Sequence, residues 1–258
     1  MFEQIKEFRG YFQEIYTYGL CLFLPSRKPS AKFLIFSFGR TGSDLLMSLL
    51  RSHPKFHCDG ELLWKKVFFP EKFIKSKEVL CKRQVYGFKM LSTHFAIQGI
   101  ADPTEFIQEL NLLGYKVINL RRRDIIRQSI SHIYALHRKK FHHKESQGVQ
   151  MHKKIFIPIE QFQRELELIS SCNLMESQIL SNIPNMQLYY EDDLFDEGMH
   201  QFTINRICDY LGVSHATVHT EFLKTTPLDL SIIIDNYEDL LAYKNPTKFP
   251  NSTIKLNK

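Results

Sequence analysis

The chain has 258 residues, of which 43% are hydrophobic and 24% charged, and its formal net charge is +6. This size and composition are typical of one large globular domain and exclude a disordered chain, while the moderate basic charge favours an anionic ligand. The basic clusters carry no recognised nucleic-acid motif, and the 5 cysteines form no C-x-x-C pair, so we expect no nucleic acid, no disulfide framework, no metal site and a reducing, cytoplasmic compartment.

The first element is an apolar segment from Tyr16 to Leu24. It follows charged residues and ends at Pro25, and it is too short to span a bilayer and lacks a small-residue cleavage site. We expect an N-terminal helix within residues 1–24 that packs on the domain, with no integral membrane span. A role at the membrane surface is the alternative.

The next element is a β-branched and aromatic run from Lys32 that ends in a glycine-containing turn and opens into a leucine-rich helix. Such a turn offers backbone N–H groups and a helix N-terminus to an anion. Gly39 and Gly42 allow close backbone approach. Ser43 can cap the helix, and Arg40 supplies a permanent positive charge. The turn lacks the lysine of the ATP-binding motif G-x-x-x-x-G-K-[ST], which disfavours an ATPase or kinase.

Short apolar runs then alternate with helical patterns. This alternation predicts an α/β fold, a single domain with a parallel sheet flanked by helices. Gly114 and Gly212 stand where helices should end. We expect a core over 32–243 and a C-terminal tail over 244–258, with strands at 32–37, 84–90, 115–120 and 186–190 and helices at 43–53, 71–80, 103–113, 124–140, 159–182 and 199–211.

A second cluster of arginines follows the strand expected at 115–120. Arginines just past a strand end in an α/β sheet face the crevice where ligands bind. Together with the first turn, the run from Arg121 to Ser131 suits a ligand with two separated anionic groups. The alternative is a surface arginine cluster neutralised by Asp124 and nearby carboxylates.

The two motifs together resemble the sulfotransferases that use 3′-phosphoadenosine 5′-phosphosulfate (PAPS), in particular the bacterial carbohydrate type typified by trehalose sulfotransferase. In that family R-T-G-S after the first strand holds the 5′-phosphosulfate, and R-R-D-x-x-x-Q-x-x-S after a later strand holds the 3′-phosphate. The matching residues are Arg40, Thr41, Gly42 and Ser43 with the adjoining Asp44, and Arg122, Arg123, Asp124, Gln128 and Ser131.

The resemblance implies a P-loop-kinase-like sulfotransferase fold and PAPS as the sulfate donor, with no metal. Arg123 and Ser131 have the spacing of the family's 3′-phosphate pair, but Arg121 and Ser129 have the same spacing, so both registers stay open. Further segments that resemble the family lie at 53–61, 85–90, 188–192 and 228–241, so the likeness covers about residues 32–243.

The expected acceptor hydroxyl needs a general base. Glu61 matches the family's glutamate after the first helix, although it can instead be a solvated carboxylate or an ion-pair partner of Lys65 or Lys66. His94 is the rival base, because it lies near where cytosolic sulfotransferases place a catalytic histidine. Lys89 either points into the ligand crevice or is a lysine of a buried strand that pairs with an acid.

Asp44 departs from the family, which commonly has Thr or Asn at this position. Its carboxylate favours the helix dipole but disfavours an adjacent phosphate. Asp44 therefore either caps the first turn or pairs with Arg40, or it faces the acceptor pocket and selects a cationic acceptor such as an amine.

The basic stretch from His137 to Gln150 is the best candidate for a mobile excursion, as a solvated helix end or as a lid over an anionic ligand. The expected function is transfer of a sulfuryl group to a hydroxyl, or an amine, of a carbohydrate, glycolipid or small natural product. The alternatives are sulfation of an alkaloid-like, cationic secondary metabolite and a non-catalytic nucleotide-binding relative.

Overall fold

The computed structural model describes residues 14–19, 28–138, 153–222 and 227–243. The chain divides into two compact units: Met1–Arg123 with Ser171–Thr220, and Asp124–Ser170 with Glu221–Lys258. That the whole chain forms one domain stays a prediction. Of the expected N-terminal helix, residues 14–19 are described, and they are helical.

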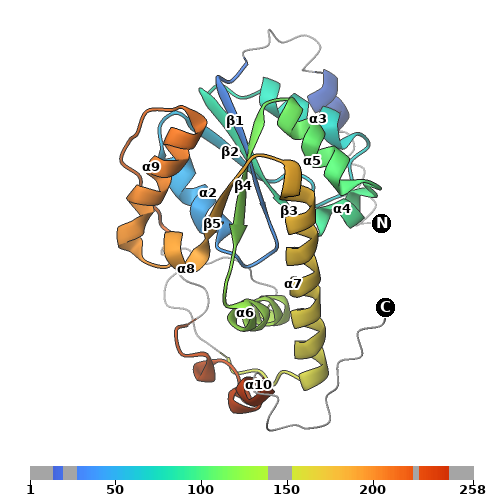
Figure 1. Ribbon diagram of the computed structural model, residues 1–258, viewed down its shortest axis with the longest axis vertical. Helices are drawn as coiled ribbons and strands as arrows, with labels where there is room; N and C mark the ends of the chain where they lie inside the picture. The colour runs from blue at the N-terminus through green and yellow to red at the C-terminus, as the bar shows by residue number, and fades with distance from the viewer. Residues whose placement is uncertain (1–13, 20–27, 139–152, 223–226, 244–258) are drawn as a thin grey trace. The chain divides into compact units, whose positions relative to one another are not determined.

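The first unit is built on a five-stranded sheet in the order β2-β3-β1-β4-β5 (Figure 1). Every neighbouring pair of strands is parallel, so the strands end at one common edge. This confirms the predicted α/β fold with a parallel sheet. The strands are β1 (Ala31–Ser37), β2 (Phe56–Glu61), β3 (Val85–Leu91), β4 (Tyr115–Arg121) and β5 (Asn185–Tyr189).

The chain order reverses at β1, which lies between β3 and β4. In open α/β sheets such a switch point is where ligands bind, outside the carboxyl ends of the strands. β2 was not among the expected strands. It is an edge strand whose pattern alternates, with Phe56 and Cys58 buried and His57 exposed, so it lacks the continuous apolar run of a central strand.

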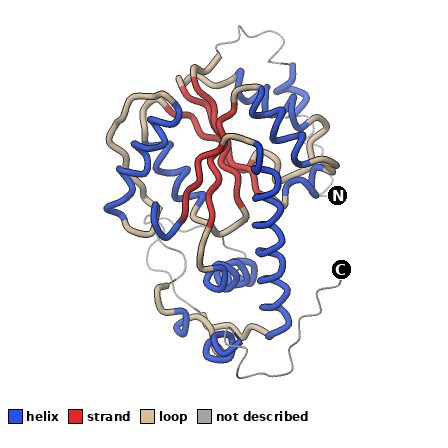
Figure 2. Tube along the Cα trace, viewed as in Figure 1, coloured by secondary structure: helices blue, strands red, loops and turns tan. Residues whose placement is uncertain are grey.

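Helices cover both faces of this sheet, as the blue and red segments of Figure 2 show. Successive residues of β1 point to opposite faces: Phe33 and Ile35 pack in one apolar cluster, and Leu34 and Phe36 in the other. Both faces of β1 are buried for this reason. One face carries α2 (Ser43–Ser52) and α9 (His200–Leu211), and the other α3 (Pro70–Val79), α4 (His94–Gln98) and α5 (Pro103–Leu112).

The predicted helix ends at two glycines are confirmed. Gly114, after α5, has φ 93°, and Gly212 closes α9 with φ 73°. Both angles lie in the left-handed region that glycine adopts without strain. The segment between β5 and α9 holds the short helices α8 (Tyr190–Asp193) and η3 (Glu197–Met199).

The second unit has its own apolar core, in which Ile133 of α6 packs in one cluster with Phe162 and Leu240. Asp124 accepts a hydrogen bond from the Arg127 N–H at 2.8 Å and so caps the start of α6. Its helices are α6 (Ile125–Arg138), residues 159–170 of α7 (Ile159–Ile179), η4 (Leu230–Ile232) and α10 (Tyr237–Tyr243). Most of the basic stretch His137–Gln150 lies outside the described residues. Across the described parts of both units, no helix combines the length and apolar character that a membrane crossing requires.

Candidate functional site

The turn after β1 adopts a strained backbone that glycine makes possible. Arg40 has φ 64° and Gly42 has φ 88°, both left-handed. A Cβ atom on Gly42 would lie 2.6 Å from the Tyr190 ring, so a side chain at this position clashes. The turn also closes on itself, because the Thr41 hydroxyl donates to the Phe38 carbonyl at 3.2 Å.

The expectation that Ser43 caps α2 is wrong. Gly42 is the N-cap residue, and the cap position makes no side-chain hydrogen bond. Ser43 is the first helical residue and is buried. Gly42 has no side chain that could cap the helix, and first-turn N–H groups at a helix N-terminus favour a bound anion.

Two guanidinium groups meet at this turn. Arg122, just after β4, donates from Nη1 to the Arg40 carbonyl at 3.3 Å, and its guanidinium lies 4.6 Å from the centre of the Tyr190 ring. Burial lowers the pKa of Arg40, Asp44 raises it and Arg122 lowers it further. An anion bound here would offset both the burial of the charge and the repulsion between the two cations.

A second group of charges lies where β2 and β3 end. Lys89 Nζ lies 2.6 Å from Asp44 Oδ1 and 2.9 Å from Glu61 Oε1. Glu61 and Lys89 are paired in register across β2 and β3, and Asp44 stands in the first turn of α2. The Lys89 side chain is only 3% exposed, whereas those of Asp44 and Glu61 are 35% and 29% exposed. Two carboxylates thus neutralise one buried ammonium, and they form the solvent side of the cluster.

His94 supports this cluster with both ring nitrogens. Its Nδ1 accepts from the Leu91 N–H at 3.3 Å, and its Nε2 lies 3.3 Å from Glu61 Oε2. Because a backbone N–H is always a donor, Nδ1 is unprotonated and Nε2 carries the proton that Glu61 accepts. His94 therefore has no ring nitrogen left to accept a proton from an acceptor hydroxyl.

These contacts stabilise the ionised form of Glu61. Burial raises its pKa, but the hydrogen bond from His94 and the charge of Lys89 outweigh burial and lower the pKa to about 2. Glu61 is ionised throughout the neutral range. Of the two alternatives for Lys89, the structure has the pairing with an acid, and its partners are Glu61 and Asp44. Glu61 is thus an ion-pair partner, but of Lys89 and not of the expected Lys65 or Lys66.

Arg121 and Arg123, on either side of Arg122, have helix or carboxylate partners. Arg121 donates from Nη2 to the Asn173 carbonyl at 3.0 Å and to the Ser177 hydroxyl at 2.8 Å. Arg123 forms an ion pair with Asp192, and its guanidinium lies 3.7 Å from the centre of the Tyr189 ring. Its backbone N–H donates to Glu191 at 3.0 Å, so the carboxylates after β5 balance the charge of Arg123.

Ser131 and Ser129 belong to the second unit. Ser131 is buried in α6, and the Ser129 hydroxyl donates to the Ile125 carbonyl of its own helix at 2.7 Å. Arg121 and Ser129 are thus each occupied by partners in their own units. A phosphate held jointly by Arg123 and Ser131 stays a prediction.

One buried polar group beside β4 was not predicted from the sequence. Glu176 of α7 is fully buried, and its Oε2 accepts from Asn119 Nδ2 of β4 at 3.1 Å. Burial raises the pKa of Glu176 above its usual value, although the hydrogen bond from Asn119 and the charge of Arg121 act in the opposite direction. A lone glutamate within a 21-residue helix looks like a solvated residue, so the sequence carries no signal for it.

The described residues contain no group of three or more His, Cys, Asp or Glu side chains that could hold a metal ion. No protein-family model matches the chain, and no curated protein matches it. Among solved structures, the chain is similar to a crystal structure of the mouse sulfotransferase SULT7A1 complexed with PAP. The identity is 12%, the TM-score is 0.43, and the match covers 93% of this chain and 73% of that chain. A likeness this distant assigns no activity to the chain.

Proposed function

We propose that the chain is a PAPS-dependent sulfotransferase whose acceptor is a hydroxyl of a carbohydrate, glycolipid or small natural product. The observation that carries the proposal is the Asp44–Lys89–Glu61–His94 cluster. It places carboxylates and a cation beside the N-terminus of α2, which begins at the serine of R-T-G-S. An anion site and a base side by side are what transfer of an anionic group to a hydroxyl requires.

In this proposal the turn binds the donor's phosphosulfate. Arg40 and the first-turn N–H groups of α2 bind the anion, and Arg122 fixes the turn from β4. The family motif assigns Arg123 and Ser131 to the donor's 3′-phosphate. These groups would act mainly by positioning the donor, as in phosphoryl transfer.

The reacting step is an in-line displacement. The acceptor oxygen forms a bond to sulfur while the bond from sulfur to the bridging phosphate oxygen breaks, and the electron pair of that bond leaves with the departing nucleotide. Glu61 takes the acceptor's proton, and Lys89 and Arg40 stabilise the charge on the leaving phosphate. As Lys89 turns toward that charge it loosens its hold on Glu61, so the pKa of Glu61 rises and the carboxylate becomes a stronger base.

His94 and Asp44 have positioning roles in this scheme. His94 orients Glu61 through its Nε2–H, and Asp44 holds the second side of Lys89. Because the Asp44 carboxylate already contacts an ammonium at 2.6 Å, the pair disfavours the hypothesis that Asp44 selects a cationic acceptor.

The test is transfer of radiolabelled sulfate from PAPS into a metabolite extract. We expect label in an acceptor with the wild-type protein and a loss of about 10²–10⁴-fold in Glu61→Gln. Lys65→Gln is the matched control, because this exposed residue lies outside the cluster. Unchanged transfer in Glu61→Gln would remove Glu61 as the base. Failure of the wild-type protein to bind the nucleotide would overturn the proposal itself.

A further inference from the structure

The loop between β2 and α3 exposes three large aromatic side chains. Trp64, Phe68 and Phe69 are 57%, 55% and 53% exposed. In the described N-terminal turn, Ile15 and Tyr16 are 58% and 65% exposed. We call these five side chains the aromatic patch. Clustered apolar groups of this size at a surface mark an interaction site.

The backbone beneath the patch is held from inside. The amide of Gln98, which is buried, donates to the carbonyls of Leu63 at 2.8 Å and Lys65 at 2.6 Å. Its oxygen accepts from the Val67 N–H at 3.0 Å. One side chain therefore satisfies three backbone groups of the loop, and the loop presents Trp64 outward in a fixed conformation.

The N-terminal turn is joined to the same loop. Glu14 accepts from the Phe68 N–H at 2.7 Å, and the Tyr18 hydroxyl donates to the Phe69 carbonyl at 3.3 Å. The Tyr18 ring also packs edge-on against Phe73 of α3, with centroids 6.4 Å apart. In Figure 1 this blue turn accordingly lies beside α3. These contacts hold the N-terminal turn against the loop and α3.

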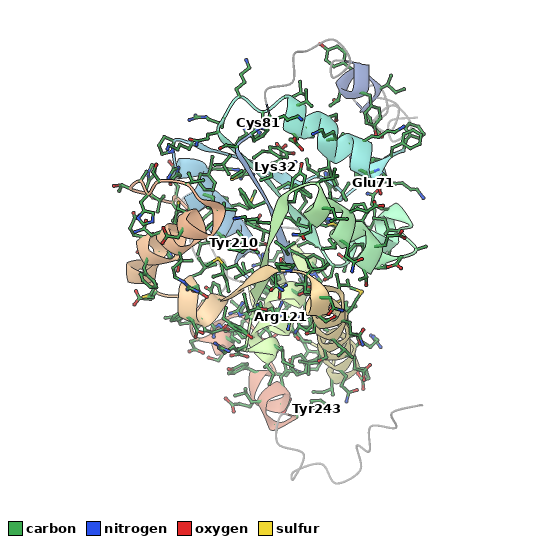
Figure 3. The ribbon with its side chains drawn as sticks, turned by 45° about the horizontal axis from the view of Figure 1, so that its top comes forward. Lys32, Glu71, Cys81, Arg121, Tyr210 and Tyr243 are labelled. Carbon is green, nitrogen blue, oxygen red and sulfur yellow. The ribbon has the colours of Figure 1, made fainter. Side chains whose placement is uncertain are left out.

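Positive charge surrounds the patch. Residues 62–78 contain five lysines and two carboxylates: Glu71 in the first turn of α3 (Figure 3), and Glu78, which forms an ion pair with Lys75. Lys65 Nζ lies 4.3 Å from the Trp64 ring centre, and Lys72 Nζ lies 4.6 Å from that of Phe69. Each of these two ammonium groups rests on an exposed aromatic ring.

We propose that the aromatic patch and its lysines bind the surface of an anionic lipid bilayer. Aromatic rings favour the boundary between headgroups and acyl chains, and lysines favour anionic headgroups. The flexible lysine stems let the ammonium groups stay at the level of the phosphates while the rings enter the bilayer.

The same chemistry disfavours a protein occupant. A protein that covered the rings would also desolvate the ammonium groups above them, which is costly without matched carboxylates. A second copy of this chain would bring lysines against lysines. The inference does not depend on sulfuryl transfer, since vesicle binding needs no donor and no acceptor.

The sole tryptophan of the chain, Trp64, makes the test direct. We expect vesicles of phosphatidylcholine with phosphatidylglycerol to shift Trp64 emission to the blue, and vesicles with brominated acyl chains to quench it. Pure phosphatidylcholine should bind less tightly, and added salt should weaken binding to the anionic vesicles. The double variant Lys65→Glu, Lys66→Glu should bind about 25-fold more weakly or worse, because each lysine near an anionic surface contributes about fivefold.

Phe68→Ser should also weaken binding, while Phe202→Ser should not. Phe202 is the matched control because it is likewise 55% exposed but lies on α9, which covers the other face of the sheet. The lysine changes alter exposed side chains and leave the core intact, so they test the surface even if Phe68→Ser unfolds. The proposal is overturned if anionic vesicles leave the emission unchanged or if the double variant binds equally well. Dimerisation that Phe68→Ser abolishes, without vesicle binding, would overturn it in favour of a protein occupant.

Discussion

Glu61 links its charge to the stability of the fold. Its pKa of about 2 lies below the usual value for an unfolded glutamate, about 4.3, so the folded state stabilises the ionised carboxylate relative to the protonated form. A depressed carboxyl pKa contributes stability above the unfolded value, and this stability is lost as the pH falls through the folded value. Glu61 therefore stabilises the protein at neutral pH but not below about pH 2.

We expect Glu61→Gln to lower the free energy of unfolding at pH 7 by about 2–3 kcal/mol. This figure is reduced from the full value of the pKa shift because part of the side chain is open to solvent. The difference should shrink steadily between about pH 5 and pH 2. Urea unfolding of both proteins across this range measures it. A difference that stays constant with pH would show that the Glu61 carboxylate is not held by Lys89 and His94.

Asp44 is not expected to determine the choice of acceptor. Its carboxylate is engaged by Lys89 at 2.6 Å, so Asp44→Asn should slow transfer without changing the preference among acceptors. Competition between a hydroxyl-bearing and an amine-bearing acceptor measures this preference. A selective loss of the amine product in Asp44→Asn would restore the hypothesis of a cationic acceptor.

At the scale of elements, the turn between β1 and α2 depends on Gly42. Alanine at this position would have to adopt a φ of 88°, and its Cβ atom would lie 2.6 Å from the Tyr190 ring. We expect Gly42→Ala to cost about 1–3 kcal/mol, which lowers Tm by several degrees. Gly39→Ala is the matched control, because a Cβ on Gly39 meets no atom within 4 Å. Calorimetric scans that give equal Tm values for the two variants would contradict this account of the turn.

The central strands could be predicted because they are buried on both faces and read as continuous apolar runs. The edge strand β2 could not, because its exposed positions interrupt that run. Ser43 was wrongly expected as a cap because the sequence does not reveal that Gly42 takes the left-handed cap position. Asp44, Glu61, Lys89 and His94 are each candidate site residues in the sequence, but nothing in the sequence links the four. Glu61 and Lys89 meet through the register of β2 and β3, which a single sequence does not fix, and α2 and α4 bring Asp44 and His94 to the same place.

For the whole molecule, the central claim is that the chain binds a nucleotide with phosphates at both its 3′ and 5′ positions. The most direct measurement is thermal unfolding with adenosine 3′,5′-bisphosphate or with ATP, for the wild type, Arg40→Ala and Arg123→Ala. A ligand at 100 times its Kd stabilises the native state by about 2.7 kcal/mol, so we expect the bisphosphate to raise Tm by about 5–10 °C. ATP should have little effect, and either variant should lose most of the shift. An equal shift with ATP, or a shift that survives in both variants, would contradict the claim.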